Sequence, residues 1–136
     1  MIETTVRSDV RQPRPLVILI GWGVLLWAAG VVLLRWLVSI DALHGTPQLI
    51  AYALVIVGTA PLIPLTPRLA GLPRTESFAA IAVPSLTALL IDGIVIGYAP
   101  WIYASDPEQA RACAGALLWG VGVALALGLA MQPRAR

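Results

Sequence analysis

Four stretches of the chain are almost continuously apolar, and short segments with Pro, Gly and charged residues separate them. The stretches are Leu16 to Leu34, Leu49 to Leu65, Phe78 to Ala99 and Ala112 to Met131. Each has about 17 to 22 residues, enough for an α-helix to cross a hydrocarbon layer about 30 Å thick. The pattern therefore predicts four membrane-spanning helices, and an even number of crossings places both chain ends on one side.

Flanking residues extend these stretches to predicted spans of about 15–40, 48–65, 77–99 and 110–131, within a membrane domain of residues 15–131. The polar segments 1–14 and 132–136 are interpreted as cytoplasmic tails. The first stretch is longer than the apolar region of a signal peptide, about 7 to 15 residues, so it is interpreted as a span. The predicted fold is all-α, a transmembrane four-helix bundle with both termini inside.

The distribution of Arg along the chain gives the predicted orientation. Seven Arg lie on the side of the two termini and two on the other, and cytoplasmic loops carry the excess of positive charge. The seven are Arg7, Arg11, Arg14, Arg68, Arg74, Arg134 and Arg136, and the two are Arg35 and Arg111. Both termini are therefore expected in the cytoplasm.

Composition supports lipid as the surrounding solvent. The chain is 59% hydrophobic and 12% charged, with a mean hydropathy of +0.86, unlike a soluble domain of this length. The nine Arg are spread thinly and form no cluster that could follow a phosphate backbone, which argues against nucleic acid. Arg without any Lys hints at a GC-rich genome, so a bacterial plasma membrane is expected. The expected partners are the lipid bilayer and either further copies of the chain or a larger membrane complex.

Several kinds of chemistry lack the residues they need. A single Cys, Cys113, excludes an intramolecular disulfide, and the only His, His44, lies in a polar connection. We see no metal-ligand set, phosphate loop or nucleophile with a base, so no metal, cofactor or catalytic residue is predicted.

Asp92 is the one acid well inside an apolar stretch, about 10 Å from the nearer end of its span. An acid at such a depth costs up to about 3 kcal/mol, so the side chain should face the bundle and be paired, protonated or hydrated. Arg35, at a similar expected depth in an extended first span, is the preferred partner, and Arg111 is the second candidate. The face of the first span around Arg35 carries Gly21 and Ala28, as expected of a helix contact.

Three roles for Asp92 stay open at this stage. It could form a buried ion pair that fixes helix register, it could bind an ion, a proton or a polar ligand, or it could reach interfacial water. Pro84 removes one backbone donor two turns earlier and predicts a kink unless Ser85 or Thr87 bonds locally. The segment Pro61–Pro67 has Pro at every third position, which favours an extended exit from an early-ending second span.

The last span has the clearest spacing pattern, with small residues at every fourth position. They are Ala112, Ala116, Gly120, Ala124 and Gly128. Such a stripe allows a neighbouring helix to approach closely. The neighbour is interpreted as a helix of the same chain, with a second copy as the alternative.

Two segments resemble the second half of the proteins of a known family. They are Ala79 to Asp92, Ala-Ala-Ile-Ala-Val-Pro-Ser-Leu-Thr-Ala-Leu-Leu-Ile-Asp, and the later Ala116-Leu-Leu-Trp-Gly-Val-Gly122. The family is an uncharacterised bacterial family of small four-span integral membrane proteins, a domain of unknown function. The resemblance implies the fold and the plasma membrane, and it implies no activity. The favoured hypothesis is a non-catalytic accessory or structural membrane protein. The alternative is a small transporter or ligand-binding protein that uses Asp92 with Arg35.

Overall fold

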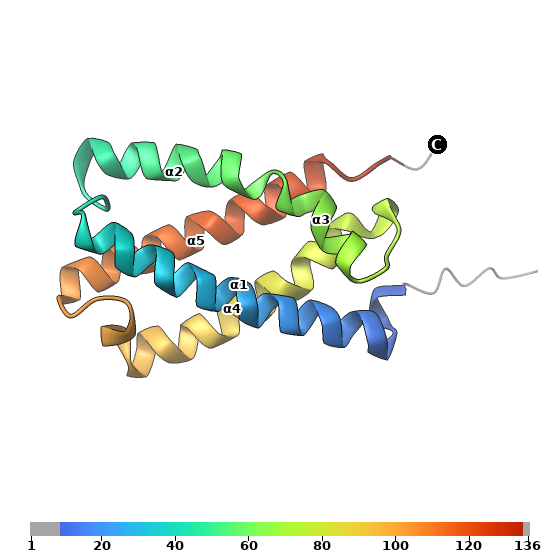
Figure 1. Cartoon of the computed structure of the whole chain (residues 1–136), viewed down its shortest axis with the longest axis horizontal. Coiled ribbons are helices and arrows are strands. Elements are labelled where there is room, and N and C mark those ends of the chain that lie inside the picture. Colours follow the sequence, from blue (N-terminus) through green and yellow to red (C-terminus); the bar gives the residue numbers. More distant parts are fainter. Residues whose placement is uncertain (1–8, 135–136) are drawn as a thin grey trace, which may run out of the picture.

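The computed structural model describes residues 9–134, and every regular element in that part of the chain is helical. Figure 1 shows the arrangement. The α-helices are α1 (Pro13–Ser39), α2 (Gly45–Thr59), α3 (Leu62–Leu69), α4 (Ser77–Tyr98) and α5 (Pro107–Ala130), with 3-10 turns at Asp9–Arg11, Arg74–Glu76 and Pro100–Ile102.

Three helical segments are long and apolar enough to cross a membrane, namely α1, α5 and the continuous segment Arg74–Tyr98. Helices α2 and α3 are also long and apolar enough to cross a membrane when they are taken together, and they meet at an angle of 42°. The described chain thus has three helices that could span a membrane, or four such segments if the bent pair counts as one. The start of α5 at Pro107 precedes the expected residue 110, because Asp106 accepts a hydrogen bond from the Gln109 amide, 3.0 Å away, and caps the helix.

The extended exit expected at Pro61–Pro67 is wrong, because Leu62–Leu69 forms the helix α3. Pro61 is the N-cap residue of this helix and Pro64 lies in its first turn. Backbone amides in the first turn have no partner within the helix, so a proline there loses no hydrogen bond. Proline therefore separates α2 from α3 and then fits at the start of the new helix.

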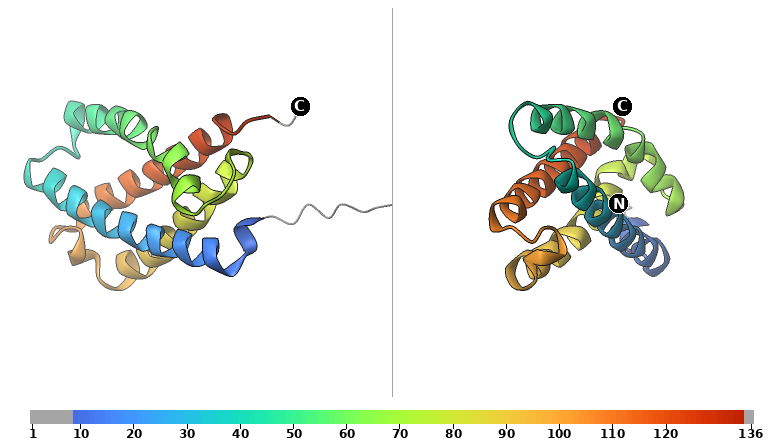
Figure 2. Two further views of the ribbon diagram at one scale, coloured as in Figure 1. Left: turned by 45° about the vertical axis from the view of Figure 1, so that its right-hand side comes forward. Right: turned by 60° about the vertical axis from the view of Figure 1, so that its left-hand side comes forward.

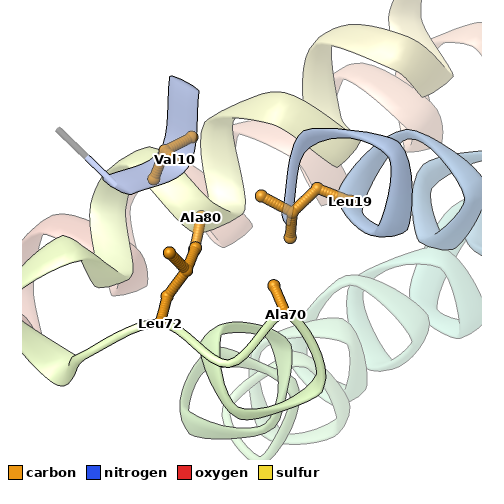
Figure 3. Close-up of a cluster of buried hydrophobic side chains, with 5 residues drawn as sticks. All are labelled: Val10, Leu19, Ala70, Leu72 and Ala80. Carbon is orange, nitrogen blue, oxygen red and sulfur yellow. The ribbon is translucent and has the colours of Figure 1, made fainter. Parts of the chain in front are cut away.

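The assignment of residues 1–14 to a tail is wrong at its end, while residues 1–8 lie outside the described part. Val10 is buried with Leu19, Ala70, Leu72 and Ala80 in a hydrophobic cluster, which Figure 3 shows. The backbone amides of Asp9 and Val10 both donate to the Glu76 carboxylate, each over 2.9 Å. The helix α1 then begins at Pro13, since proline is well suited to a first helical position.

The helices α1 and α4 pack closely, and they run in the same direction (Figures 1 and 2). A Cβ atom added at Gly23 would lie 2.8 Å from the Cα and carbonyl oxygen of Pro84 and 2.9 Å from the Cβ of Thr87. Only glycine allows this approach of the two backbones. The contact face differs from the one expected, because Gly21 has no atom within 4 Å of an added Cβ and Ala28 is exposed.

The small-residue stripe of α5 faces other helices of the same chain. Its members are buried or half-buried: Ala112, Ala116, Gly120, Ala124 and Gly128. An added Cβ at Gly128 would lie 3.4 Å from the Cβ of Ile81 in α4, and one at Gly120 would lie 3.9 Å from Val55 in α2. The helix α2 has no buried residue of its own and packs mainly on α5.

The two ends of the elongated molecule are built differently. At the Val10 end, the cluster around Val10 lies close to the starts of α1 and α4, and both described chain ends emerge there (Figure 1). At the other end, called the Tyr103 end, Leu34, Leu43, Tyr103 and Cys113 form a second buried cluster. Asp92 lies toward the Tyr103 end.

Candidate functional site at Asp92

The Asp92 carboxyl group is buried, with 4% of the residue exposed, and it accepts hydrogen bonds from two distant parts of the chain. The indole Nε1 of Trp27 in α1 lies 2.9 Å from Asp92 Oδ1. The Tyr103 hydroxyl, from the connection between α4 and α5, donates to the same oxygen. Trp27 Nε1 is also 3.0 Å from the Tyr103 hydroxyl oxygen, so the three side chains form one cluster. We call it the Asp92 cluster.

The helix α4 carries Asp92 without interruption past Pro84, which lies inside it. Thr87 Oγ1 donates to the Val83 carbonyl over 2.9 Å, whereas the carbonyl that Pro84 leaves without its usual donor is that of Ala80. Pro84 is buried against Gly23. The position of Pro84 thus fixes the contact between α4 and α1. The kink that the sequence predicts at Pro84 stays a prediction.

Tyr103 reaches Asp92 because the turn Pro100–Ile102 reverses the chain after α4. The Tyr103 side chain is 1% exposed and packs in the second hydrophobic cluster. Burial raises the pKa of the Tyr103 phenol above its usual range, and the hydrogen bond to Asp92 and the charge of Asp92 raise it further. The phenol therefore keeps its proton near neutral pH and acts as the donor to Asp92.

The expected ion pair between Arg35 and Asp92 does not form. Arg35 Nη1 donates to the Ile102 carbonyl over 2.8 Å and lies 3.5 Å from the Trp101 carbonyl. The one contact between oppositely ionisable side chains among the described residues is exposed and joins His44 Nδ1 to Asp41 Oδ1 at 2.9 Å, an ion pair only when His44 is protonated.

The reason lies in the register of the two parallel helices. Because Gly23 is opposite Pro84 and Thr87, Trp27 comes opposite Asp92 one turn later. Arg35 follows Trp27 by about 12 Å along α1, at about 1.5 Å per residue, and so reaches the connection beyond α4. Arg111 is exposed near the start of α5 and belongs to no recorded ion pair among residues 9–134.

Trp27 and Tyr103 are the cluster residues that sequence reasoning missed. One signal was available, because Gly23 and Trp27 are four residues apart and so share a helix face. A buried indole N–H also needs an acceptor, and Asp92 was the one acid in the apolar stretches. No comparable signal pointed to Tyr103, since its approach depends on the turn that follows α4.

A cavity of about 180 Å³ lies at the Tyr103 end, next to the Asp92 cluster. Its lining residues are Arg35, Val38, Ser39, Tyr103, Ala104, Ser105 and Gln109. Tyr103 therefore borders the cavity and also donates to the buried carboxyl. Arg35 is the one charged residue of this lining.

A second indole of α1 makes a simpler polar contact toward the Val10 end. Trp22 Nε1 donates to the buried Thr66 hydroxyl over 3.1 Å, and that hydroxyl donates to the Leu62 carbonyl over 2.8 Å. This contact joins α1 to α3 without any ionisable group.

The remaining candidates for chemistry stand apart from each other. Within residues 9–134, no three His, Cys, Asp or Glu side chains come together as a metal site would require. Cys113 is buried in the cluster with Tyr103. The Asp92 cluster can thus connect α1, α4 and the following connection through a single carboxyl oxygen.

Comparisons with models of known protein families, with curated proteins and with solved structures gave no match for this chain.

Proposed function

We propose that the protein is a four-span helical bundle of the bacterial plasma membrane, with both termini in the cytoplasm, that acts as a non-catalytic structural or accessory component. Its outward surface suits lipid, since Val17, Leu49, Val57 and Leu129 are each about 70% exposed. The family resemblance of the Ala79–Asp92 segment agrees with this proposal and stays an expectation.

The observation that carries the proposal is the way the Asp92 carboxyl is bound. Two neutral donors, from α1 and from the connection after α4, meet on one carboxyl oxygen. No buried side-chain N or O atom among the described residues is without a hydrogen-bond partner. A buried carboxyl oxygen that accepts from two separate segments holds them in one arrangement, which suits a structural role.

The alternative of a transporter or ligand-binding protein that uses Asp92 with Arg35 has less support, because the two side chains bind different partners. The cavity beside Arg35 is the observation that favours it.

The test of the structural role compares stability in detergent for three variants. Asp92→Leu leaves the buried Tyr103 hydroxyl without its acceptor, while Trp27 Nε1 keeps only the Tyr103 oxygen, and we expect a cost of about 1 to 3 kcal/mol. The triple variant Asp92→Leu, Trp27→Phe, Tyr103→Phe removes the donors as well and should recover much of the loss. Ser85→Ala, in the same helix and outside the cluster, is the control. If Asp92→Leu were as stable as the parent, the acid would not be structural and the proposal would fail.

The proposed orientation has its own test. Reporter fusions that report cytoplasmic or periplasmic location should give opposite signals after Arg136 and within the connection near Asp106. The fusion after Arg136 should report the cytoplasm, as the excess of Arg on that side requires. A periplasmic signal there would overturn the orientation and leave the helical fold untouched.

A further inference from the structure

The cavity at the Tyr103 end is a half-open depression bordered by three separate parts of the chain. The last turns of α1 contribute one wall, the segment 103–105 contributes another, and Gln109 of α5 completes it. Both helices end or begin here, so in the proposed bundle the cavity lies at a membrane surface. A site at that depth can be reached from water and from lipid headgroups alike.

The charge at this cavity is held in place. Arg35 is the one charged residue of the lining, and its Nη1 is fixed by the Ile102 carbonyl at 2.8 Å. A guanidinium group has five N–H donors. Among residues 9–134, acceptors are recorded only for Nη1. The other donors therefore stay available for a ligand beside a preoriented positive charge.

The polar groups around Arg35 also suit an anion. Ser105 and Gln109 bring one hydroxyl group and one amide to the lining, while the Ser39 hydroxyl already donates to the Trp36 carbonyl over 2.6 Å. Gln109 lies in the first turn of α5, where the backbone dipole favours negative charge. The nearby acid Asp106 is outside the lining, and its carboxylate already accepts from the Gln109 amide. The Tyr103 hydroxyl donates to Asp92, so its ring serves as a wall.

We propose that this cavity binds one anionic oxyacid group, a phosphate or a carboxylate, with Arg35 as the principal ligand. The planar fork of Arg matches two oxygens of such a group. A volume of about 180 Å³ suits one small polar group, because pockets for drug-sized molecules are about 300 Å³ or larger. The group can belong to a phospholipid headgroup or to a free anion, and the chemistry that recognises it is the same.

The experiment measures binding to the purified full-length chain in neutral detergent. Native mass spectrometry follows phosphatidylglycerol against diacylglycerol with the same acyl chains, which lacks the phosphate, and calorimetry follows inorganic phosphate. Arg35→Gln should weaken binding about tenfold or more, since a charge-assisted contact is lost. The matched control is Arg111→Gln, because Arg111 is also an exposed Arg near this end but lies outside the cavity lining. It should change binding less than about twofold.

A second variant covers the case in which Arg35→Gln fails to fold. Gln109→Phe fills the cavity, leaves the charge of Arg35 in place and should also abolish binding. Binding of phosphatidylglycerol alone would identify a lipid headgroup, and binding of phosphate as well would identify a site open to free anions. The proposal is overturned if neither probe binds, or if Arg35→Gln and Arg111→Gln weaken binding equally.

Discussion

Two indoles near the middle of α1 make contrasting contacts, Trp22 on the side toward the Val10 end and Trp27 on the side toward the Tyr103 end. Trp22 donates a hydrogen bond to the Thr66 hydroxyl, and that hydroxyl donates one to the Leu62 carbonyl within the same short helix. Trp27 donates to the Asp92 carboxyl, which also accepts from Tyr103 in the connection after α4. The first contact is neutral and joins two helices, whereas the second includes an ionisable group and joins three segments.

The contrast shows where an ionisable group has been retained at a cost. Helix α1 could be held at both indoles by neutral acceptors, as it is by Thr66 at Trp22. In the proposed bundle, an acid inside a membrane span costs more than a hydroxyl, so Asp92 needs more donors than Thr66 does. The Val10 end depends instead on apolar packing around Val10 and Leu19.

The largest expected effect comes from the contact that positions both indoles. Gly23→Leu would force side-chain atoms into the backbone of Pro84, which cannot move as a flexible side chain can. We expect a loss of about 3 kcal/mol or more, with both indole contacts disrupted. Thermal unfolding in detergent measures the loss, and Gly21→Leu, with open space around its Cβ, is the matched control. Equal stability of the two variants would show that α1 and α4 do not meet at Gly23.

A smaller effect separates the two indole contacts. Trp27→Phe removes a donor from a buried carboxyl and should cost about 1 to 3 kcal/mol. Trp22→Phe leaves the Thr66 hydroxyl bonded to Leu62 and should cost nearer 0.6 kcal/mol, about the average for hydrogen bonds between membrane helices. Steric trapping or thermal unfolding can rank the two variants. A larger loss for Trp22→Phe would reverse the contrast drawn above.

The smallest effect is a pH dependence confined to the Tyr103 end. The pKa of Tyr103 is raised in the folded protein above its usual value of 10.0, first by burial and then by Asp92. The stabilisation is therefore complete below about pH 10 and is lost as pH rises beyond it, because the unfolded chain then releases a proton that the folded chain keeps. Unfolding temperatures at pH 8 and pH 11 should show this loss. Tyr103→Phe should reduce the difference, and an unchanged difference would refute the assignment.

The helical fold follows from the sequence because apolar length alone predicts it. Every residue of a span must satisfy its backbone within the helix, so long apolar stretches become helices whatever their contacts. The sequence-based prediction fails at Pro61–Pro67, where proline was interpreted as ending helical structure. Proline ends one helix there and begins the next, and only the path of the chain after Thr59 distinguishes the two outcomes.

The candidate site was predictable only in part, because depth along a span is easier to estimate than the direction a side chain faces. Asp92 is the single acid within the apolar stretches, and the structure buries it. Its partner was misassigned because Arg35 was placed by depth alone. The register set by Gly23 and the turn before Tyr103 decide the partners, and neither follows from the length of the apolar stretches.

The beginning of α4 has a consequence for the order of synthesis. Its N-cap residue Glu76 gives no side-chain bond to the helix and instead binds the backbone of Asp9 and Val10. The amide of Phe78 is bonded by the side chain of Gln132, at 3.0 Å. A ribosome makes Asp9 before α4 and Gln132 after α5. The first turn of α4 therefore gains its last side-chain partner only after the whole of α5 has been synthesised.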